Sequence, residues 1–244
     1  MGLRVAIALG AVLLLGCQRE QLDDCITSAG PMATQERALA EFSSIDLKDR
    51  VDLLFEHRSS NTVAVEAGSS LLDQVVTEVR DGTLYIRNEN RCNWVRSFKP
   101  RITVKVPLDQ IAKLTVRGTG NVDCADTLVR ERFDLAQWSA QGSVRMLLDV
   151  QTLDAGLHTG AGDVKLEGRC SGEAFLYSGI MGPLDASGLR SRFVSVNNSG
   201  IADVRCWATT FLVVQLNSFG DVYFSGDPLN VESSINGTGR LIRE

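Results

Sequence analysis

Apolar and polar positions in the second half of the chain form a short pattern that recurs about every 20 residues. Each repeat contains a small residue and, two positions later, an aliphatic residue, usually followed by a polar and then an apolar residue. The pairs of small and aliphatic residues are Gly120/Val122, Gly142/Val144, Gly162/Val164, Gly182/Leu184, Ala202/Val204, Gly220/Val222 and Gly239/Leu241. Alternation of this kind is typical of a strand with one buried face. A fixed period of this length predicts a solenoid, in which each repeat is one coil of chain stacked on the next.

The recurring glycine predicts a turn at the same place in every coil. We expect glycine there because it adopts a positive φ without steric cost. Pro183 lacks a backbone N–H and belongs in a turn, and Ala202 indicates one turn of a different form. A second apolar stretch precedes most turns, so each coil is expected to run strand, turn, strand and loop. These stretches are Leu114–Val116, Phe133–Leu135, Ala174–Tyr177, Phe193–Val196 and Phe211–Leu216.

Aligned on the aliphatic residue, the repeats produce one polar and one apolar column. The polar column contains Asp123, Arg145, Lys165, Asp185 and Arg205. Most neighbours in it are opposite in charge, which favours stacking on adjacent strands. The apolar column contains Cys124 and Cys206, which lie four coils apart. At about 4.8 Å per coil they are too far apart for a disulfide, so we expect them to be core residues.

The first half of the chain predicts strands without a fixed period. Asp81-Gly82 predicts a hairpin turn, and Ser69–Gln74 predicts a short helical turn. The expected strands are Ser44–Leu47, Val51–Glu56, Thr62–Glu66, Val75–Arg80, Thr83–Asn88, Ile102–Val106 and Ile111–Val116. We therefore predict an all-β fold: a right-handed parallel β-helix, or β-solenoid-like stack, of about seven coils over residues 117–244. An irregular β region over residues 37–116 is expected to cap it, since an open sheet end would recruit other chains.

The first residues follow the order of a bacterial lipoprotein signal. The apolar run Val5–Leu15 is too short to span a bilayer and is typical of a signal peptide. It leads into Leu14-Leu15-Gly16-Cys17, which resembles a lipobox, whose cysteine is lipidated. We expect a signal peptide over residues 1–16, a lipid on Cys17 and a tether over residues 17–36; an ordinary signal peptide with a chance cysteine is the alternative. Gln18 after the cysteine favours the outer membrane, and its periplasmic and cell-surface faces both stay open.

The composition and charge limit the partners, metals and cofactors that we expect for this chain. The formal net charge is −5 and no run of Lys and Arg occurs, which argues against a nucleic-acid partner. The sequence contains neither a CxxC motif nor a cluster of His and Cys at metal-ligand spacing, so it does not indicate a metal site. No cofactor is expected. Of the six cysteines, Cys25 and Cys92 are the expected disulfide in an oxidising compartment. Because five cysteines remain beside Cys17, at least one thiol is free or paired between chains.

Oxygen-bearing side chains recur directly before the aliphatic residue, at Asn121, Asp163, Asp203 and Asp221. Stacked oxygens of this kind could bind Ca²⁺ or a sugar. We favour turn chemistry, because Asp and Asn bond to nearby backbone and Ser143 and Pro183 interrupt the column. A Ser–His–Asp triad would need His57 or His158 beside a nucleophile, and a solvated or structural role is expected for both. No catalytic residue is predicted.

The most concentrated recognition candidate lies outside the repeat. It consists of Trp94 with Arg91, Arg96 and Lys99. A tryptophan among cations could stack on a sugar ring or on a partner protein. A tryptophan that packs in the cap, with solvated basic neighbours, is the alternative that we favour.

Several segments resemble the head GIN domain family, also called putative auto-transporter adhesins, which occurs largely on Bacteroidetes lipoproteins. The resemblance covers roughly residues 24–244. Its segments are Asp24-Cys25 with Gly30, Phe42-Ser43-Ser44-Ile45-Asp46-Leu47, Val65-Glu66-Ala67-Gly68, Asp81-Gly82-Thr83-Leu84-Tyr85-Ile86-Arg87-Asn88, Arg91-Cys92-Asn93-Trp94-Val95-Arg96-Ser97 and the glycine repeats. It implies a solenoid-like β fold and a role in adhesion, and it brings no catalytic residues.

These observations lead to one functional expectation. We expect a lipid-anchored envelope protein that presents a solenoid binding surface for cell adhesion, with a glycan or a protein as its ligand. A structural component that docks with other envelope proteins is the first alternative. A carbohydrate-active enzyme of the β-helix type is the second.

Overall fold

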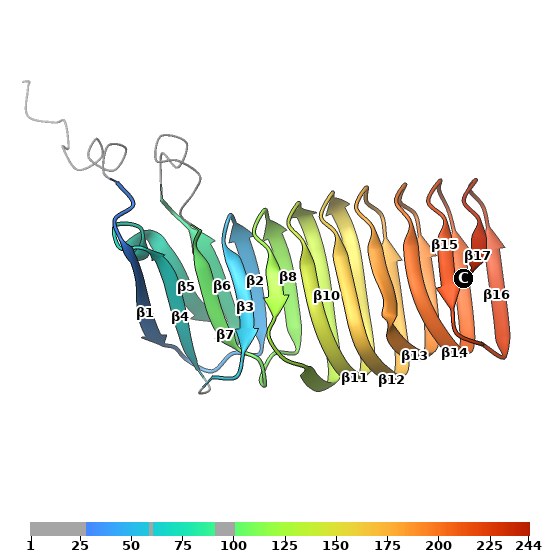
Figure 1. The fold of residues 1–244 in the computed structure, drawn as a ribbon, viewed down its shortest axis with the longest axis horizontal. Coiled ribbons are helices and arrows are strands. Elements are labelled where there is room, and N and C mark those ends of the chain that lie inside the picture. Colours follow the sequence, from blue (N-terminus) through green and yellow to red (C-terminus); the bar gives the residue numbers. More distant parts are fainter. Residues whose placement is uncertain (1–27, 59–60, 91–100) are drawn as a thin grey trace, which may run out of the picture.

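The computed structural model describes residues 28–58, 61–90 and 101–244. In this part of the chain the regular secondary structure consists of strands and one 3₁₀ turn, η3 (Leu72–Gln74). The strands wind into an elongated solenoid, with successive coils side by side along its axis (Figure 1). The predicted all-β solenoid with a β cap is thereby confirmed. No helix in the described ranges has the length and apolarity needed to cross a bilayer.

Each regular coil is one long strand that bends once. The five long strands are β10 (Leu128–Ala140), β11 (Val144–Gly160), β12 (Val164–Ser178), β13 (Leu184–Asn198) and β14 (Val204–Leu216). They pair in parallel, and a shift of register marks the bend, as between Val150 and Thr152 of β11. The predicted second strands therefore exist, but four of them are the second halves of β10, β12, β13 and β14, and no loop separates the halves. Because each strand is continuous through its bend, its backbone groups hydrogen-bond to the neighbouring coils on both sides of the bend.

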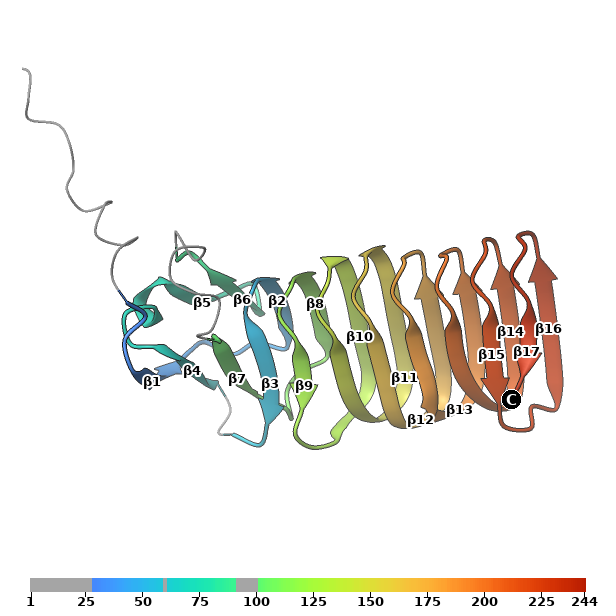
Figure 2. The same ribbon diagram turned by 45° about the horizontal axis from the view of Figure 1, so that its top comes forward.

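The two halves of the long strands build two sheets that enclose the core (Figure 2). Val144, Val164, Leu184, Val204 and Val222 stack in one buried column, as the repeat predicts. The first halves continue into β15 (Val222–Ser225) and β17 (Leu241–Arg243), and the second halves into β16 (Asn230–Ile235).

Order along the chain and order in space differ at the start of the solenoid. The first coil, β2 (Ser44–Asp49) and β3 (Asp52–Glu56), lies between two later coils. Strand β2 pairs in parallel with β6 (Thr83–Asn88) on one side and β8 (Lys113–Gly118) on the other. Strand β3 likewise lies between β7 (Thr103–Pro107) and β9 (Val122–Cys124). The chain thus builds a coil, leaves it to form the cap, and returns to its other side.

Antiparallel strands close this end. Strand β4 (Thr62–Gly68) pairs with β7 and with β1 (Met32–Ala38), and β5 (Val75–Arg80) forms the predicted hairpin with β6. Asp81 and Gly82 both have positive φ, as a tight hairpin turn requires. The chain is already in β1 from Met32, so the prediction of a tether up to residue 36 is wrong by five residues at that end. Its cause is the polar sequence of β1, whose residues are exposed or half-buried.

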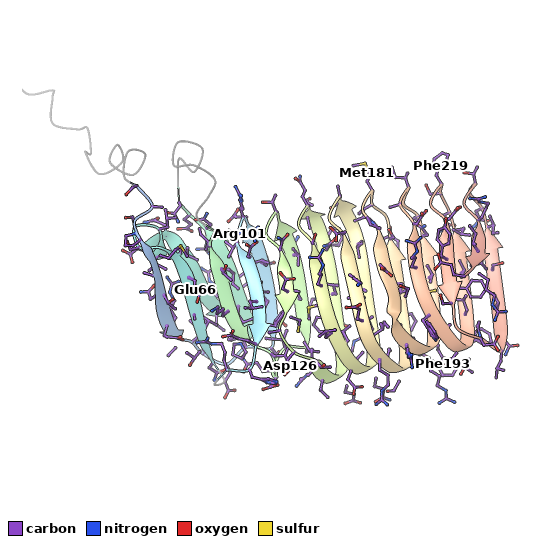
Figure 3. All side chains as sticks on the ribbon, viewed as in Figure 1. Glu66, Arg101, Asp126, Met181, Phe193 and Phe219 are labelled. Atoms are coloured by element: carbon purple, nitrogen blue, oxygen red, sulfur yellow. The ribbon has the colours of Figure 1, made fainter. Side chains whose placement is uncertain are left out.

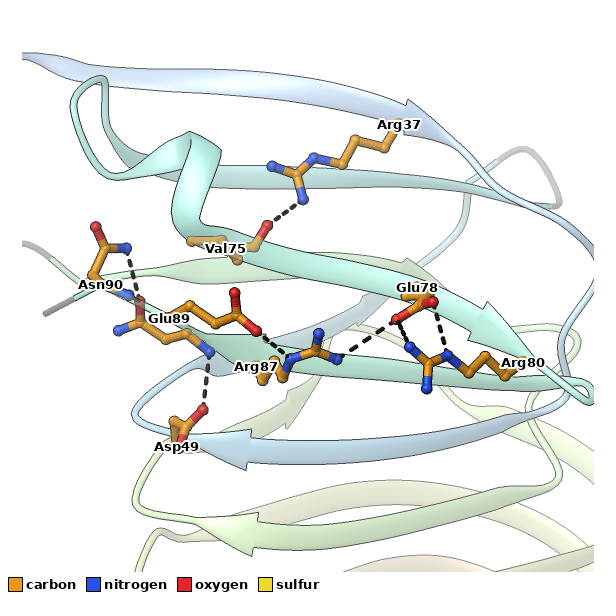
Figure 4. A network of polar contacts seen from close by, with 9 residues as sticks. Arg37, Asp49, Val75, Glu78, Arg80, Arg87, Glu89 and Asn90 are labelled. Carbon is orange, nitrogen blue, oxygen red and sulfur yellow. Dashed lines mark hydrogen bonds and ion pairs between the residues drawn. The ribbon is translucent and has the colours of Figure 1, made fainter. Parts of the chain in front are cut away.

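Arg37 of β1 connects three elements of the cap through hydrogen bonds to η3 and β5 (Figure 4). Its guanidinium donates to the carbonyl oxygens of Val75 at 2.5 Å and Leu72 at 2.8 Å, and to Thr77 Oγ1 at 3.0 Å. Burial lowers the pKa of Arg37, with Asp73 acting in the opposite direction.

Nearby, Glu78 binds Arg80 at 2.7 Å and lies 3.7 Å from Arg87. The Arg37 contacts hold η3 and β5 against the edge strand β1, and Glu78 links β5 to β6.

The recurring glycines have a different cause from the one expected. None of the six glycines in the repeat pairs has a positive φ. A Cβ on any of them would instead lie 2.5 Å or less from a backbone oxygen of the preceding coil. For Gly142, Gly162, Gly182 and Gly239 that oxygen belongs to the previous glycine of the column. Close approach of coils therefore selects glycine, and the prediction of positive φ is wrong.

The buried thiols agree in part with the prediction. Cys206 is 1% exposed, and burial raises the pKa of its thiol to about 12. Cys124 is only partly buried, and its Sγ lies 2.8 Å from the carbonyl oxygen of Asp126. Both are free thiols, as is Cys170.

Replacing Gly142 by alanine should destabilise the fold by about 2 kcal/mol or more, because the new methyl group would overlap the backbone oxygen of Gly120. Urea unfolding measures the loss. Gly188→Ala is the matched control, since its Cβ would meet the flexible Glu167 side chain at 3.0 Å. Equal stability of the two variants would contradict the stacking argument.

Candidate binding surface

The oxygen-bearing residues before each aliphatic position hold consecutive coils together. Backbone N–H of Asn121 donates to Asp52 Oδ1 at 2.8 Å, and N–H of Ser143 donates to Asn121 Oδ1 at 3.1 Å. Farther along, N–H of Asp221 donates to Asp203 Oδ1 at 2.9 Å. Each side chain thus caps a backbone donor one coil further on, which supports turn chemistry as its role.

Asp163 and Asp221 also accept hydrogen bonds of other kinds. The next residue of the column after Asp163 is Pro183, which has no N–H to donate, and Asp163 accepts from the Ser143 hydroxyl at 2.6 Å. Asp221 accepts from the backbone N–H of Arg240 at 2.7 Å and from its guanidinium at 2.8 Å. The side-chain hydrogen bond from Arg240 is the main cause that lowers the pKa of Asp221.

His57 lies in an exposed cluster of acids. Its Nδ1 is 3.4 Å from Asp109 Oδ2 and its Nε2 is 2.9 Å from Asp126 Oδ2. The hydrogen bond with Asp109 is the first of several contacts that raise the pKa of His57. Both ring nitrogens face carboxylates, so neither is directed at a nucleophile. The structural role predicted for His57 fits this geometry.

His158 belongs to an aromatic stack on the outside of the second halves. Its ring centroid is 4.0 Å from that of Trp138, with 11° between the planes, and 5.3 Å from that of Tyr177. Desolvation lowers the pKa of His158, opposed by Asp154. The imidazole therefore favours its neutral form and acts as a third aromatic ring.

The outer side of the first halves is charged. We call it the charged face: Arg145, Lys165, Asp185 and Arg205, which stack in register from β11 to β14. The predicted column is correct, but in the described part of the chain its opposite-charge neighbours do not form ion pairs within 4 Å. Lys165 binds Glu167 of its own strand at 2.9 Å, and the guanidinium of Arg205 lies 4.8 Å from the ring of Tyr223.

On the outside of the second half of β12, Glu173 lies next to the bend. From there to the turns, the outer side of β12, β13 and β14 carries no charge. We call it the uncharged face: Phe175, Tyr177, Gly179, Ser195, Asn197, Ser199, Val213, Gln215 and Asn217. Its amides are linked: Asn197 Nδ2 donates to Gln215 Oε1 at 3.1 Å, and Asn217 Nδ2 donates to Asn197 Oδ1 at 3.2 Å. Asn236 adds a bond to Asn217 Oδ1 at 3.0 Å. Sequence reasoning missed this face, although the alternation in each second half contains it.

A third surface runs along the turns. Met181, Ile201 and Phe219 are 63%, 56% and 71% exposed in three successive turns. Figure 3 shows Met181 and Phe219 on the edge opposite Phe193, which lies near a bend. The turns therefore carry a short apolar ridge.

The remaining candidate residues lie outside the described residues. They are the lipidation candidate Cys17, the disulfide candidates Cys25 and Cys92, and the recognition patch Arg91, Trp94, Arg96 and Lys99. These stay predictions.

Comparisons with known proteins agree with this geometry. A family model described as "Putative auto-transporter adhesin, head GIN domain" matches residues 41–228. No protein of curated description matches significantly.

Solved structures share the fold. A putative adhesin from Bacteroides fragilis is similar with a TM-score of 0.79 and 24% identity, covering 88% of this chain and 97% of that one. A putative lipid binding protein from Parabacteroides distasonis has a TM-score of 0.67 at 18% identity, with coverages of 88% and 97%. A putative adhesin from Parabacteroides merdae has a TM-score of 0.63 at 16% identity, with coverages of 89% and 98%.

Asp203→Ala should lower the free energy of unfolding by about 1 kcal/mol, because the backbone N–H of Asp221 loses its acceptor. Asp203→Asn keeps an oxygen at this position and should retain most of the stability in urea unfolding. Millimolar calcium should leave the melting temperature of the natural chain unchanged. A rise with calcium that Asp203→Asn abolishes would instead indicate a metal site.

The two histidines should titrate on opposite sides of the ordinary value of about 6.5, His57 above it and His158 below it. The stabilisation from His57 is full below the unfolded pKa and is lost as pH rises through the folded pKa. That from His158 is full above the unfolded pKa and is lost as pH falls through the folded pKa. NMR of the imidazole protons measures both, and His57→Gln assigns them. Coincident titrations would contradict the two environments.

Proposed function

Because this chain belongs to the putative auto-transporter adhesin, head GIN domain family, we propose that it is a lipid-anchored envelope protein whose solenoid presents a binding surface for adhesion. One observation carries the proposal: the coils stack into a scaffold whose outward side chains form long surfaces of different chemistry. Extended surfaces of this kind suit extended ligands.

The anchor is the first part of the proposal. The order of apolar run, small residue and cysteine at Leu14-Leu15-Gly16-Cys17 supports lipidation of Cys17. The residues between Cys17 and strand β1 would then act as a tether to the outer membrane. The proposal includes either face of that membrane.

The chemistry of the described surface supports binding rather than catalysis. His57 directs both ring nitrogens at carboxylates, and His158 is part of the aromatic stack. The acids of the turn column accept backbone and side-chain hydrogen bonds. We therefore propose a binding protein over a carbohydrate-active enzyme. The patch around Trp94 is a second candidate for recognition.

The apolar ridge favours a second candidate function. Met181, Ile201 and Phe219 expose large apolar side chains on neighbouring turns, and such patches often mark protein contacts. A structural role, in which the ridge docks on another envelope protein, is therefore the alternative. Crosslinking in cells from a probe at Ile201 would capture that protein.

Radiolabelled palmitate should enter the natural chain but not Cys17→Ala, and the variant should leave the membrane fraction. Cys25→Ala is the matched control, because it removes a nearby cysteine and should still be labelled. Protease added to intact cells then distinguishes the two faces, since only a surface-exposed solenoid is cleaved. Equal labelling of the natural chain and Cys17→Ala would refute the anchor.

A further inference from the structure

We propose that the uncharged face, together with the aromatic stack Trp138–His158–Tyr177, binds a neutral polysaccharide that runs along the solenoid axis. The inference rests on the proposed adhesive function and names its ligand class and its surface. Four properties carry it: the distribution of charge, the exposed rings, the ordered amides and the repeat of the coil.

The charged residues that border this surface in register are acids: Asp154 of β11 lies beside Phe175, and Glu232 of β16 lies beside Val213. Charged residues make up 23% of the chain, yet the nine residues of the uncharged face include none. The charged face on the opposite sheet carries Arg145, Lys165 and Arg205 instead. An anionic ligand would find no complementary potential on the uncharged face. A ligand whose polar groups are neutral hydroxyls would pair with its amides and hydroxyls without desolvating a charge.

The aromatic stack offers apolar contact beside these amides. Trp138 is 40% exposed, and Phe175, on the uncharged face itself, is 41% exposed. Aromatic rings with an accessible face pack well against the C–H groups of a sugar ring. Because the pKa of His158 is lowered, the middle ring adds no charge to the surface.

Two glycines make room for the rings. A Cβ at Gly156 would lie 2.6 Å from His158 Nε2, and one at Gly179 would lie 2.8 Å from Tyr177 Oη. His158 therefore reaches back over Gly156 and Tyr177 reaches forward over Gly179, and a side chain at either glycine would displace the ring beside it.

The amides are already ordered. Asn197 and Asn217 fix each other's orientation through the 3.2 Å bond, and Ser199 Oγ donates to Asn197 Oδ1 at 2.8 Å. Among the described contacts, Gln215 uses only its oxygen, as acceptor from Asn197. Its two N–H donors are thus available to ligand oxygens. Ordering before binding reduces the entropy lost on association.

The repeat suits a polymer better than a single sugar. Tyr177, Asn197 and Gln215 occupy the same register on neighbouring strands, at a spacing of about 4.8 Å. Successive sugar units can then meet similar groups on successive coils. Weak contacts made by linked units add through effective concentration.

The test uses the full chain, purified in detergent, in native gels that contain a neutral polysaccharide: mannan, starch, dextran or mixed-linkage β-glucan. Polygalacturonate serves as the anionic comparison. We expect at least one neutral polymer to retard the protein. Gln215→Ala and Trp138→Ala should each weaken that binding about tenfold, the loss of one contact of about 1.4 kcal/mol.

Tyr223→Ala is the matched control, because it removes an aromatic side chain beside Arg205 on the charged side and should leave binding unchanged. Gln215 is exposed, so Gln215→Ala keeps the test valid if Trp138→Ala misfolds. The proposal is overturned if no neutral polymer retards the protein, if only polygalacturonate does, or if binding survives in both folded variants.

An adhesion assay distinguishes failure of the polysaccharide proposal from failure of the adhesive function on which it rests. Cells that display the natural chain should bind a glycan-coated surface and lose binding when a glycosidase removes the coat. Adhesion that persists after the coat is removed would refute the polysaccharide proposal and leave the adhesive function standing. Failure to adhere to any surface, with or without glycan, would refute both.

Discussion

The close approach of backbones at the turns is the constraint on which the rest of the structure depends. At each turn of the glycine column, the place where a Cβ would be is occupied by a backbone oxygen of the neighbouring coil. Parallel hydrogen bonding requires the same separation at every turn. A Cβ at one of these glycines would push two coils apart locally, whereas at Ala202, the larger residue of the column, the flanking strands β13, β14 and β15 still pair. This accounts for a glycine period beside the buried aliphatic column, in a chain whose outward columns vary widely.

The same constraint leaves the outside of the molecule free to vary. Once the inner column and the turns are set, the outward positions of each strand face only their neighbours on adjacent coils. On one sheet these positions hold charges, some paired across coils, such as Arg169 with Asp149 at 3.2 Å. On the other they hold rings and amides toward the turns, and charges such as the Arg132–Asp154 pair, at 3.5 Å, nearer the bend. Two surfaces of opposite character thus coexist on one scaffold without disturbing the core.

Much of the fold follows from the sequence, and the failures have physical causes. The apolar triplets and Asp81-Gly82 predict strands and a hairpin because both signals are local. The placement of β2 and β3 between later coils does not follow, since parallel partners far apart in sequence share the same alternation. The role of glycine was also mistaken, because a positive φ and a close contact select the same residue. The acid column was interpreted as turn chemistry because Pro183 and Ser143 interrupt it, and the backbone hydrogen bonds that its side chains accept support that role. The uncharged face was not found, because its residues contain no motif and acquire meaning only when the register places them together.

The cap and the scaffold have consequences for how a ligand could be held. Arg37 and the antiparallel strands close the core at the end nearest the proposed tether, where β1 is the edge strand. The uncharged face and the apolar ridge lie on later coils, away from that end. A protein anchored at its first residues would present these coils farthest from the membrane. Because the coils are bonded to one another on both sheets, a force on a bound polymer would be shared among several of them. Resistance to such force is what an adhesive scaffold needs, and it arises here from the same close stacking that selects glycine.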